Sequence, residues 1–194
     1  EIINELQSHR IEILIDFMGL YHADRIEIFN SRVSPLQISW LGYPNTVGFP
    51  TIDYLVTDKN LIKKNEEKLY VEKTINLPNI WNCHSGFKFD REFTESPFKK
   101  NKYITFGSFN NFLKISDDVV EVWSKILKKV NHSKLILKSS LNLNNEFILE
   151  KFEEYGVHNS IEFYAKQDFL NVENHIKLYK EVDIALDTFP YNGV

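Results

Sequence analysis

Polar and charged side chains crowd one short stretch, FGSFNNFLKIS, at residues 106–116. A loop that only reverses the chain normally uses Gly, Pro, Asp or Ser, whereas this stretch holds Asn110, Asn111 and Lys114 beside aromatic residues. A lysine close to the free N–H groups of a helix start supplies positive potential, and amides supply hydrogen bonds, so a diphosphate is a suitable ligand. The alternative is that the asparagines cap the turn and Lys114 points into water.

Two further loops combine small, polar and aromatic residues after an expected strand. WLGYPNTVG, at residues 40–48, carries Gly42, Tyr43 and Pro44, a pattern typical of a rigid loop whose backbone a ligand can approach closely. LDTFPYNG, at residues 186–193, follows the last expected strand in the same way. Ligands of open parallel sheets bind beyond the carboxyl ends of the strands, which is where all three loops are expected. Each loop alone is a weak signal.

The second half of the chain alternates apolar runs with amphipathic segments. Strands are expected at 102–108, 134–139, 160–165 and 183–189, with helices at 116–130, 144–156 and 172–182 between them. Ser116 is expected to cap the first of these helices and Gly156 to end the second. The core face of the first helix is predicted to hold Val119, Val122, Trp123, Ile126, Leu127 and Val130. This alternation predicts a parallel sheet with crossover helices, as in half of a Rossmann-like domain.

The first half repeats the alternation more loosely. A buried strand is expected at 11–19, a helix at 23–32, and strands at 35–43 and 52–58, followed by further short segments to residue 78. Residues 82–101 mix charges with Gly and Pro and indicate a linker. The sequence therefore predicts an α/β protein of two incomplete lobes, with a first lobe at 1–81, a linker at 82–101 and a second lobe at 102–194.

Composition excludes several classes of protein. The net charge of −4 argues against a nucleic-acid binder, and no apolar run is long enough to span a membrane. The chain has one cysteine, Cys83, which favours a reducing compartment and hence the cytoplasm, and its neighbour His84 lacks the further ligands of a zinc site. No Gly-x-Gly-x-x-Gly fingerprint and no Asp-x-Asp pair occurs, so neither a dinucleotide cofactor nor a metal is expected. Asp16, inside an apolar strand, is expected to be a buried structural carboxylate.

Four blocks of the chain carry a resemblance to a known family. Residues 13–48, 73–83, 106–130 and 173–193 resemble, in order, the catalytic region of the O-linked N-acetylglucosamine transferase and SPINDLY-like family, particularly its bacterial members. The resemblance implies a GT-B fold with two Rossmann-like lobes, usually preceded by tetratricopeptide repeats. It also implies metal-free, inverting transfer of a sugar, typically from UDP-N-acetylglucosamine, to Ser or Thr hydroxyls of an acceptor protein.

The same resemblance suggests roles for individual residues. Lys114 matches the family lysine at the donor diphosphate, where a fixed cation would stabilise the departing nucleotide. Asn111 and His175 match positions near the nucleotide, although a helical histidine is otherwise a surface or core-edge residue. His22 is the candidate general base, with an exposed loop histidine as the alternative. The loop expected to hold the donor phosphates contains Asp187, Thr188, Asn192 and Gly193.

The sequence departs from the family in three ways. Threonines that follow the donor loop in the family would lie beyond Val194, and the first strand with its histidine-bearing loop would precede Glu1. Val172 stands where animal members have a lysine. We therefore expect these 194 residues to be inactive alone. A lobe that binds a nucleotide sugar or a partner protein without catalysis is the competing hypothesis, and the sugar, the acceptor and the oligomeric state are not specified by the sequence.

Overall fold

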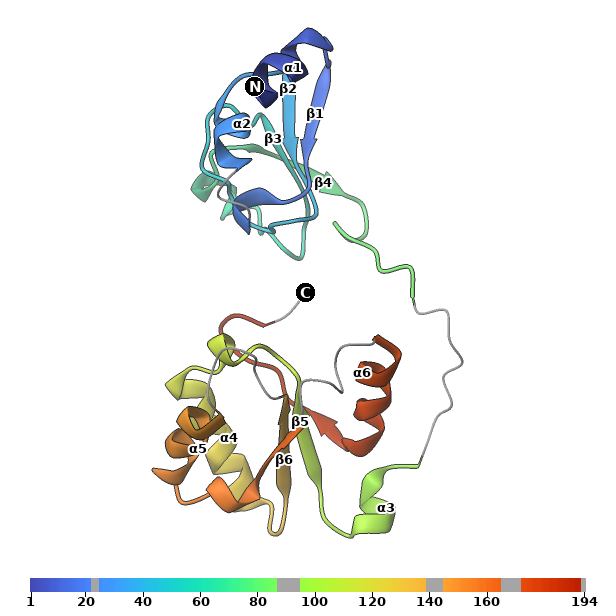
Figure 1. The fold of residues 1–194 in the computed structure, drawn as a ribbon, viewed down its shortest axis with the longest axis vertical. Coiled ribbons are helices and arrows are strands. Elements are labelled where there is room, and N and C mark those ends of the chain that lie inside the picture. The colour runs from blue at the N-terminus through green and yellow to red at the C-terminus, as the bar shows by residue number, and fades with distance from the viewer. Residues whose placement is uncertain (22–24, 87–94, 139–144, 165–171, 193–194) are drawn as a thin grey trace. The chain divides into compact units, whose positions relative to one another are not determined.

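The computed structural model describes residues 1–21, 25–86, 95–138, 145–164 and 172–192. The chain divides into two compact units, Glu1–Phe87 and Lys88–Val194. Each unit contains one four-stranded sheet, and all the described strand pairs are parallel (Figure 1). The predicted α/β class with two Rossmann-like lobes is confirmed. Among the described residues, every helix is too short or too polar to serve as a membrane span.

The first unit has its strands in sequence order. The sheet runs β1-β2-β3-β4. Its elements are α1 (Ile2–Ser8), β1 (Ile13–Asp16), η1 (Gly19–Tyr21), α2 (Ile26–Asn30), β2 (Leu36–Ser39), β3 (Tyr54–Asp58), η3 (Glu67–Leu69) and β4 (Lys73–Leu77). Helix α1 was not predicted from the sequence, and it has no side-chain cap and no buried residue.

Only one face of this first sheet is well covered. Gln37, Leu55 and Thr57 lie on that face and are fully buried. On the opposite face Ile13 is 52% exposed and Ile75 38% exposed. The expectation of a buried strand at 11–19 is therefore wrong for β1, because Ile13 and Ile15 lie on the sheet face that is not well covered. An apolar run alone does not reveal which face of a sheet is covered.

The second unit has the strand order β7-β6-β5-β8. Its elements are α3 (Pro97–Asn101), β5 (Thr105–Ser108), η4 (Phe112–Lys114), α4 (Asp117–Lys129), β6 (Lys134–Lys138), α5 (Asn145–Glu153), η5 (His158–Ser160), β7 (Ile161–Tyr164), α6 (Val172–Leu178), η7 (Tyr179–Glu181) and β8 (Ile184–Ala185). Figure 1 shows α4 and α5 on one side of this sheet and α6 on the other side. The second unit therefore has three layers, a sheet with helices on both faces, as a doubly wound fold requires.

Helix α4 begins where the sequence predicts. The Ser116 hydroxyl accepts a hydrogen bond from the Val119 N–H at 3.4 Å, which caps the helix. The buried side chains of the helix are Val119, Val120, Trp123, Ser124 and Leu127. Val122 was expected in this core face but is 40% exposed. The buried stripe is centred on the side of Val120 and Leu127, which leaves Val122 beyond its edge.

Helix α3 lies within the range predicted as linker and is tied to the second sheet by Asp183. The Asp183 carboxylate accepts hydrogen bonds from the Ser96 hydroxyl, from the Phe98 N–H at 2.9 Å and from the Thr105 N–H at 2.9 Å. Burial alone would raise the pKa of Asp183, but these three bonds outweigh it and lower the pKa below its usual value. Residues 96–98 are thereby fixed beside the start of β5.

Candidate functional site

The candidate site lies where the order in which the chain adds strands to the second sheet reverses. From β5 the chain moves outward to β6 and β7, and then returns to place β8 on the other side of β5. The loops after β5 and β8 leave the sheet at neighbouring carboxyl ends, because these two strands are parallel partners. Such a switch point is the usual ligand site of open α/β sheets.

The two loops at the switch point are joined by side chains. The Asn110 Nδ2 donates a hydrogen bond to the Asp187 Oδ1 at 2.7 Å. The Lys114 Nζ donates to the backbone carbonyl of Asn192 at 3.2 Å and lies 4.6 Å from the centre of the Tyr191 ring. The structure thus brings together four of the polar residues that the two sequence stretches contain, together with an aromatic ring.

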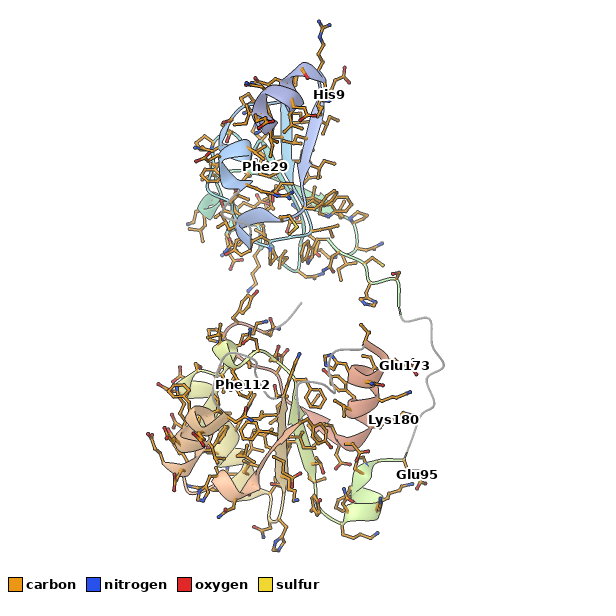
Figure 2. The ribbon with its side chains drawn as sticks, viewed as in Figure 1. His9, Phe29, Glu95, Phe112, Glu173 and Lys180 are labelled. Atoms are coloured by element: carbon orange, nitrogen blue, oxygen red, sulfur yellow. The ribbon has the colours of Figure 1, made fainter. Side chains whose placement is uncertain are left out.

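Local packing explains the placement of Lys114. Phe109, Phe112 and Ile115 are buried and anchor the loop from below, and Phe112 is labelled in Figure 2. The Asn111 Oδ1 accepts a hydrogen bond from the Leu113 N–H at 3.0 Å and caps the 3-10 turn that ends at Lys114. Of the two predicted capping asparagines, only Asn111 caps the turn, and Lys114 reaches the loop after β8.

The loop after β8 is held by its own hydrogen bonds. The Thr188 side chain is 2% exposed, and its hydroxyl donates to the Tyr191 carbonyl at 2.8 Å. The Thr188 N–H donates to the Asp187 Oδ1 at 2.9 Å. Asp187, Thr188 and Asn192 therefore lie in one folded loop, whereas Gly193 lies outside the described residues.

His175 lies on α6 and contacts the start of the loop after β5. Its ring centre is 5.9 Å from that of Phe109 and 5.8 Å from that of Tyr179, and Tyr179 is 4.8 Å from Phe109. Burial, followed by the positive charge of Lys138, lowers the pKa of His175 below its usual 6.5. The imidazole is therefore neutral at pH 7, which suits hydrogen bonding or stacking better than charge pairing. Burial also raises the pKa of Tyr179, and the charge of Asp187 adds to this.

The predicted residues of the first unit lie in a tightly packed loop after β2. A Cβ on Gly42 would stand 2.0 Å from the carbonyl oxygen of Phe17, so only glycine fits at this position. Gly19 has a φ of +55°, and a Cβ added there would stand 2.4 Å from the Cβ of Tyr43. The loop with Gly42, Tyr43 and Pro44 is thus built against the loop after β1. This close approach between two backbones explains the glycine without a ligand.

Buried carboxylates fix the loops of the first unit. Asp16 is 2% exposed and accepts hydrogen bonds from the Met18 N–H at 2.9 Å and the Gly19 N–H at 3.0 Å, which confirms the expected structural role. Glu72 accepts from the Thr46 hydroxyl at 2.6 Å and the Val47 N–H at 2.7 Å. His22 lies outside the described residues.

Sequence reasoning missed the partners that position the predicted residues. Tyr191, Tyr179 and Glu72 were not singled out as site residues, and the bond from Asn110 to Asp187 was not predicted, because these contacts join distant parts of the chain. The only available signal was the sequence FNN itself, in which two amides precede the lysine. In the described part of the chain no group of three or more His, Cys, Asp and Glu side chains is arranged to hold a metal ion.

The chain is similar to known proteins of one family. Residues 1–87 match Glycosyl transferase family 41. Over its whole length the chain is 33% identical to a probable UDP-N-acetylglucosamine–peptide N-acetylglucosaminyltransferase SPINDLY of Solanum lycopersicum and 31% identical to the corresponding SPINDLY protein of Arabidopsis thaliana. The chain spans 21% of the length of each of these relatives.

A solved structure is similar as well. A lysine-to-methionine mutant of the O-GlcNAc transferase of Thermobaculum terrenum superimposes with a TM-score of 0.84 at 25% sequence identity. The similarity covers 99% of this chain and 36% of that protein.

Proposed function

Since the chain is a region of a glycosyl transferase family 41 protein, of the O-GlcNAc transferase and SPINDLY family, we propose that its second unit binds the nucleotide sugar of an inverting glycosyl transfer. The donor is UDP-N-acetylglucosamine, and the acceptor is a Ser or Thr hydroxyl of a protein. Tetratricopeptide repeats elsewhere in the full-length protein recognise that acceptor. No metal ion or organic cofactor takes part.

The observation that carries this proposal is the place of the Lys114 ammonium. It lies at the switch point of the second sheet, against a neutral carbonyl and a neutral ring. In the described part of the chain no carboxylate forms an ion pair with Lys114. Its positive charge is therefore available to a diphosphate, which is a stronger acceptor than the Asn192 carbonyl.

The proposed glycosyl transfer is favoured by a cation beside the donor diphosphate. As the bond between the anomeric carbon and the phosphate oxygen breaks, negative charge grows on the leaving UDP while the sugar becomes oxocarbenium-like. A fixed ammonium at the diphosphate stabilises that charge more in the transition state than in the ground state. The acceptor oxygen attacks the opposite face of the sugar and gives up its proton to a base, for which His22 is the candidate.

The remaining predicted residues would contribute binding. Asn111 and His175 would contact the nucleotide, and Thr188, Asn192 and Gly193 would surround the phosphates. Asp187 leads into this loop. A nearly neutral imidazole in contact with Phe109 is a suitable neighbour for a ribose or base. From the first unit, the loop of Gly42, Tyr43 and Pro44 would supply further substrate contacts.

The test compares wild-type full-length protein with Lys114→Ala. Binding of UDP-GlcNAc, UDP-glucose and GDP-fucose is measured by isothermal titration, and transfer to a Ser-containing peptide is measured in parallel. We expect transfer from UDP-GlcNAc to fall about 100-fold or more in Lys114→Ala, with a smaller loss of binding. The matched control is Lys128→Ala, which removes an exposed lysine of α4.

Other results of this test would change the proposed function. Binding of a nucleotide sugar by the wild type without transfer to any acceptor would favour a non-catalytic binding lobe. Unchanged transfer by a folded Lys114→Ala protein would remove Lys114 from the mechanism. Preference for GDP-fucose would replace the donor but keep the role of the lysine.

A further inference from the structure

The Asn110–Asp187 hydrogen bond is one of three successive links between the segments that follow β5 and β8. The Leu186 N–H donates to the Gly107 carbonyl at 2.8 Å, which extends the strand pairing by one step. The Asn110–Asp187 bond comes next, and the Lys114–Asn192 bond is farthest from the sheet. The two segments are therefore linked at three places as far as Asn192, although Asn110 and Asp187 are 77 positions apart in the sequence.

The carboxylate of Asp187 is exposed but already accepts two hydrogen bonds from the protein. Its Oδ1 accepts from the Asn110 amide at 2.7 Å and from the Thr188 N–H at 2.9 Å. A carboxylate turned toward a diphosphate would repel it, because like charges at short distance are unfavourable. Asp187 is thus better suited to hold the loop than to bind the donor directly.

Donor binding changes the outermost link. The Lys114 ammonium has three N–H donors, and a diphosphate that it contacts competes with the Asn192 carbonyl for them, so donor binding would weaken or redirect the Lys114–Asn192 bond. The Asn110–Asp187 bond does not involve the ammonium and can persist. Lys114 lies only four residues after Asn110, on a short turn capped by Asn111. Its position therefore depends on how firmly Asn110 is held.

We propose that Asn110 is a positioning residue of the transfer reaction: with Asp187 it keeps the two loops together, and so holds Lys114 in place while the ammonium contacts the donor. This inference rests on the proposed function. Misplacement of a catalytic group by about 1 Å can cost two orders of magnitude in rate, so a link at this distance from the ammonium affects turnover. The effect is expected mainly on kcat, because the bond is present before and after the donor binds.

The test is a swap of the two groups in the full-length protein. Asn110→Ala and Asp187→Ala should each lower kcat about tenfold, which is less than the loss that a full 1 Å misplacement of Lys114 would cause. Asn110→Asp should lose at least as much, because two carboxylates then face each other. Asp187→Asn should lose less than Asp187→Ala, since its amide oxygen can still accept from Asn110 and Thr188.

The double variant Asn110→Asp/Asp187→Asn gives the decisive measurement. It restores the bond with donor and acceptor exchanged, and kcat should return to within about threefold of the wild type. Asn131→Ala, which changes an exposed asparagine in the turn after α4, is the matched control. Rates are normalised to the number of UDP-binding sites, so that a loss of folded protein alone does not lower them.

The outcomes separate this inference from the function on which it rests. If the wild type neither binds UDP nor transfers sugar, the proposed function fails. If the wild type is active and depends on Lys114, but Asn110→Ala keeps its kcat per binding site, only the inference fails. A double variant as slow as Asn110→Asp would likewise overturn the role of the exchanged bond.

Discussion

Glu72 and Val47 lie 25 positions apart, and the Glu72 Oε1 accepts a hydrogen bond from the Val47 N–H at 2.7 Å. The Glu72 side chain is 3% exposed, and the same carboxylate also holds the Thr46 hydroxyl and the Gly48 N–H. One buried side chain before β4 therefore fixes the backbone of the loop after β2. This loop carries the predicted substrate residues of the first unit.

We expect Glu72→Ala to lower the free energy of unfolding by about 2–3 kcal/mol, because it leaves buried N–H groups without an acceptor. Glu72→Gln should cost less, since its amide oxygen can still accept from Val47. Urea denaturation of the chain measures both, with the exposed Glu12→Ala as the control. Equal stability of Glu72→Ala and wild type would show that the carboxylate does not hold this loop.

Gly42→Ala should destabilise the first unit by roughly 1–3 kcal/mol or more, because the added Cβ would stand 2.0 Å from the Phe17 carbonyl oxygen and the backbone must move. Gly156→Ala provides the comparison. A Cβ at Gly156 meets nothing within 4 Å, and its cost comes only from the φ of +66°, about 1 kcal/mol. Thermal unfolding measures both variants, and a smaller loss for Gly42→Ala than for Gly156→Ala would contradict the close approach.

Trp123→Ala should cost about 3–5 kcal/mol, since the ring is 2% exposed within the core of the second unit. Val122→Ala, one position earlier on α4, should change stability by about 0.5 kcal/mol or less, because Val122 is 40% exposed. The pair of denaturation curves checks the orientation of the helix. Similar losses for the two variants would mean that the buried stripe runs elsewhere.

The lowered pKa of His175 predicts a loss of stability in mild acid. Because the folded protein binds this proton less tightly than the unfolded chain, the contribution of His175 is fully present above its usual pKa of 6.5 and is lost as the pH falls toward the lower folded value. NMR titration of the ring should give a midpoint below 6.5. The wild type should also lose more stability than His175→Gln between pH 7 and pH 5. A midpoint at or above 6.5 would show that burial does not lower the pKa of His175.

Local signals were sufficient for most elements of the second unit. The Ser116 cap, the Gly156 stop and the alternation of strands and helices depend on neighbouring residues, and the structure confirms them. The burial of β1 and of Val122 was predicted wrongly. Both depend on which neighbours cover a face, and the composition of a single element does not contain that information.

The candidate site shows the same division. Lys114 was predicted from its position after a strand, and the structure places it at the switch point. Its partner Asn192 and the bond from Asn110 to Asp187 join residues 78 and 77 positions apart. No spacing rule pairs residues at such separations, so these partners could be found only once the order of the strands was known.

The adjacency of β5 and β8 has a consequence for how ligand binding would be felt in solution. Lys114 and Asn192 are 78 positions apart, and the chain between them includes α4, β6, α5, β7 and α6. A small molecule that binds both loops would link the two ends of this long segment. Its binding energy should therefore slow amide exchange deep in β6, far from any atom that it touches, and not only in the loops.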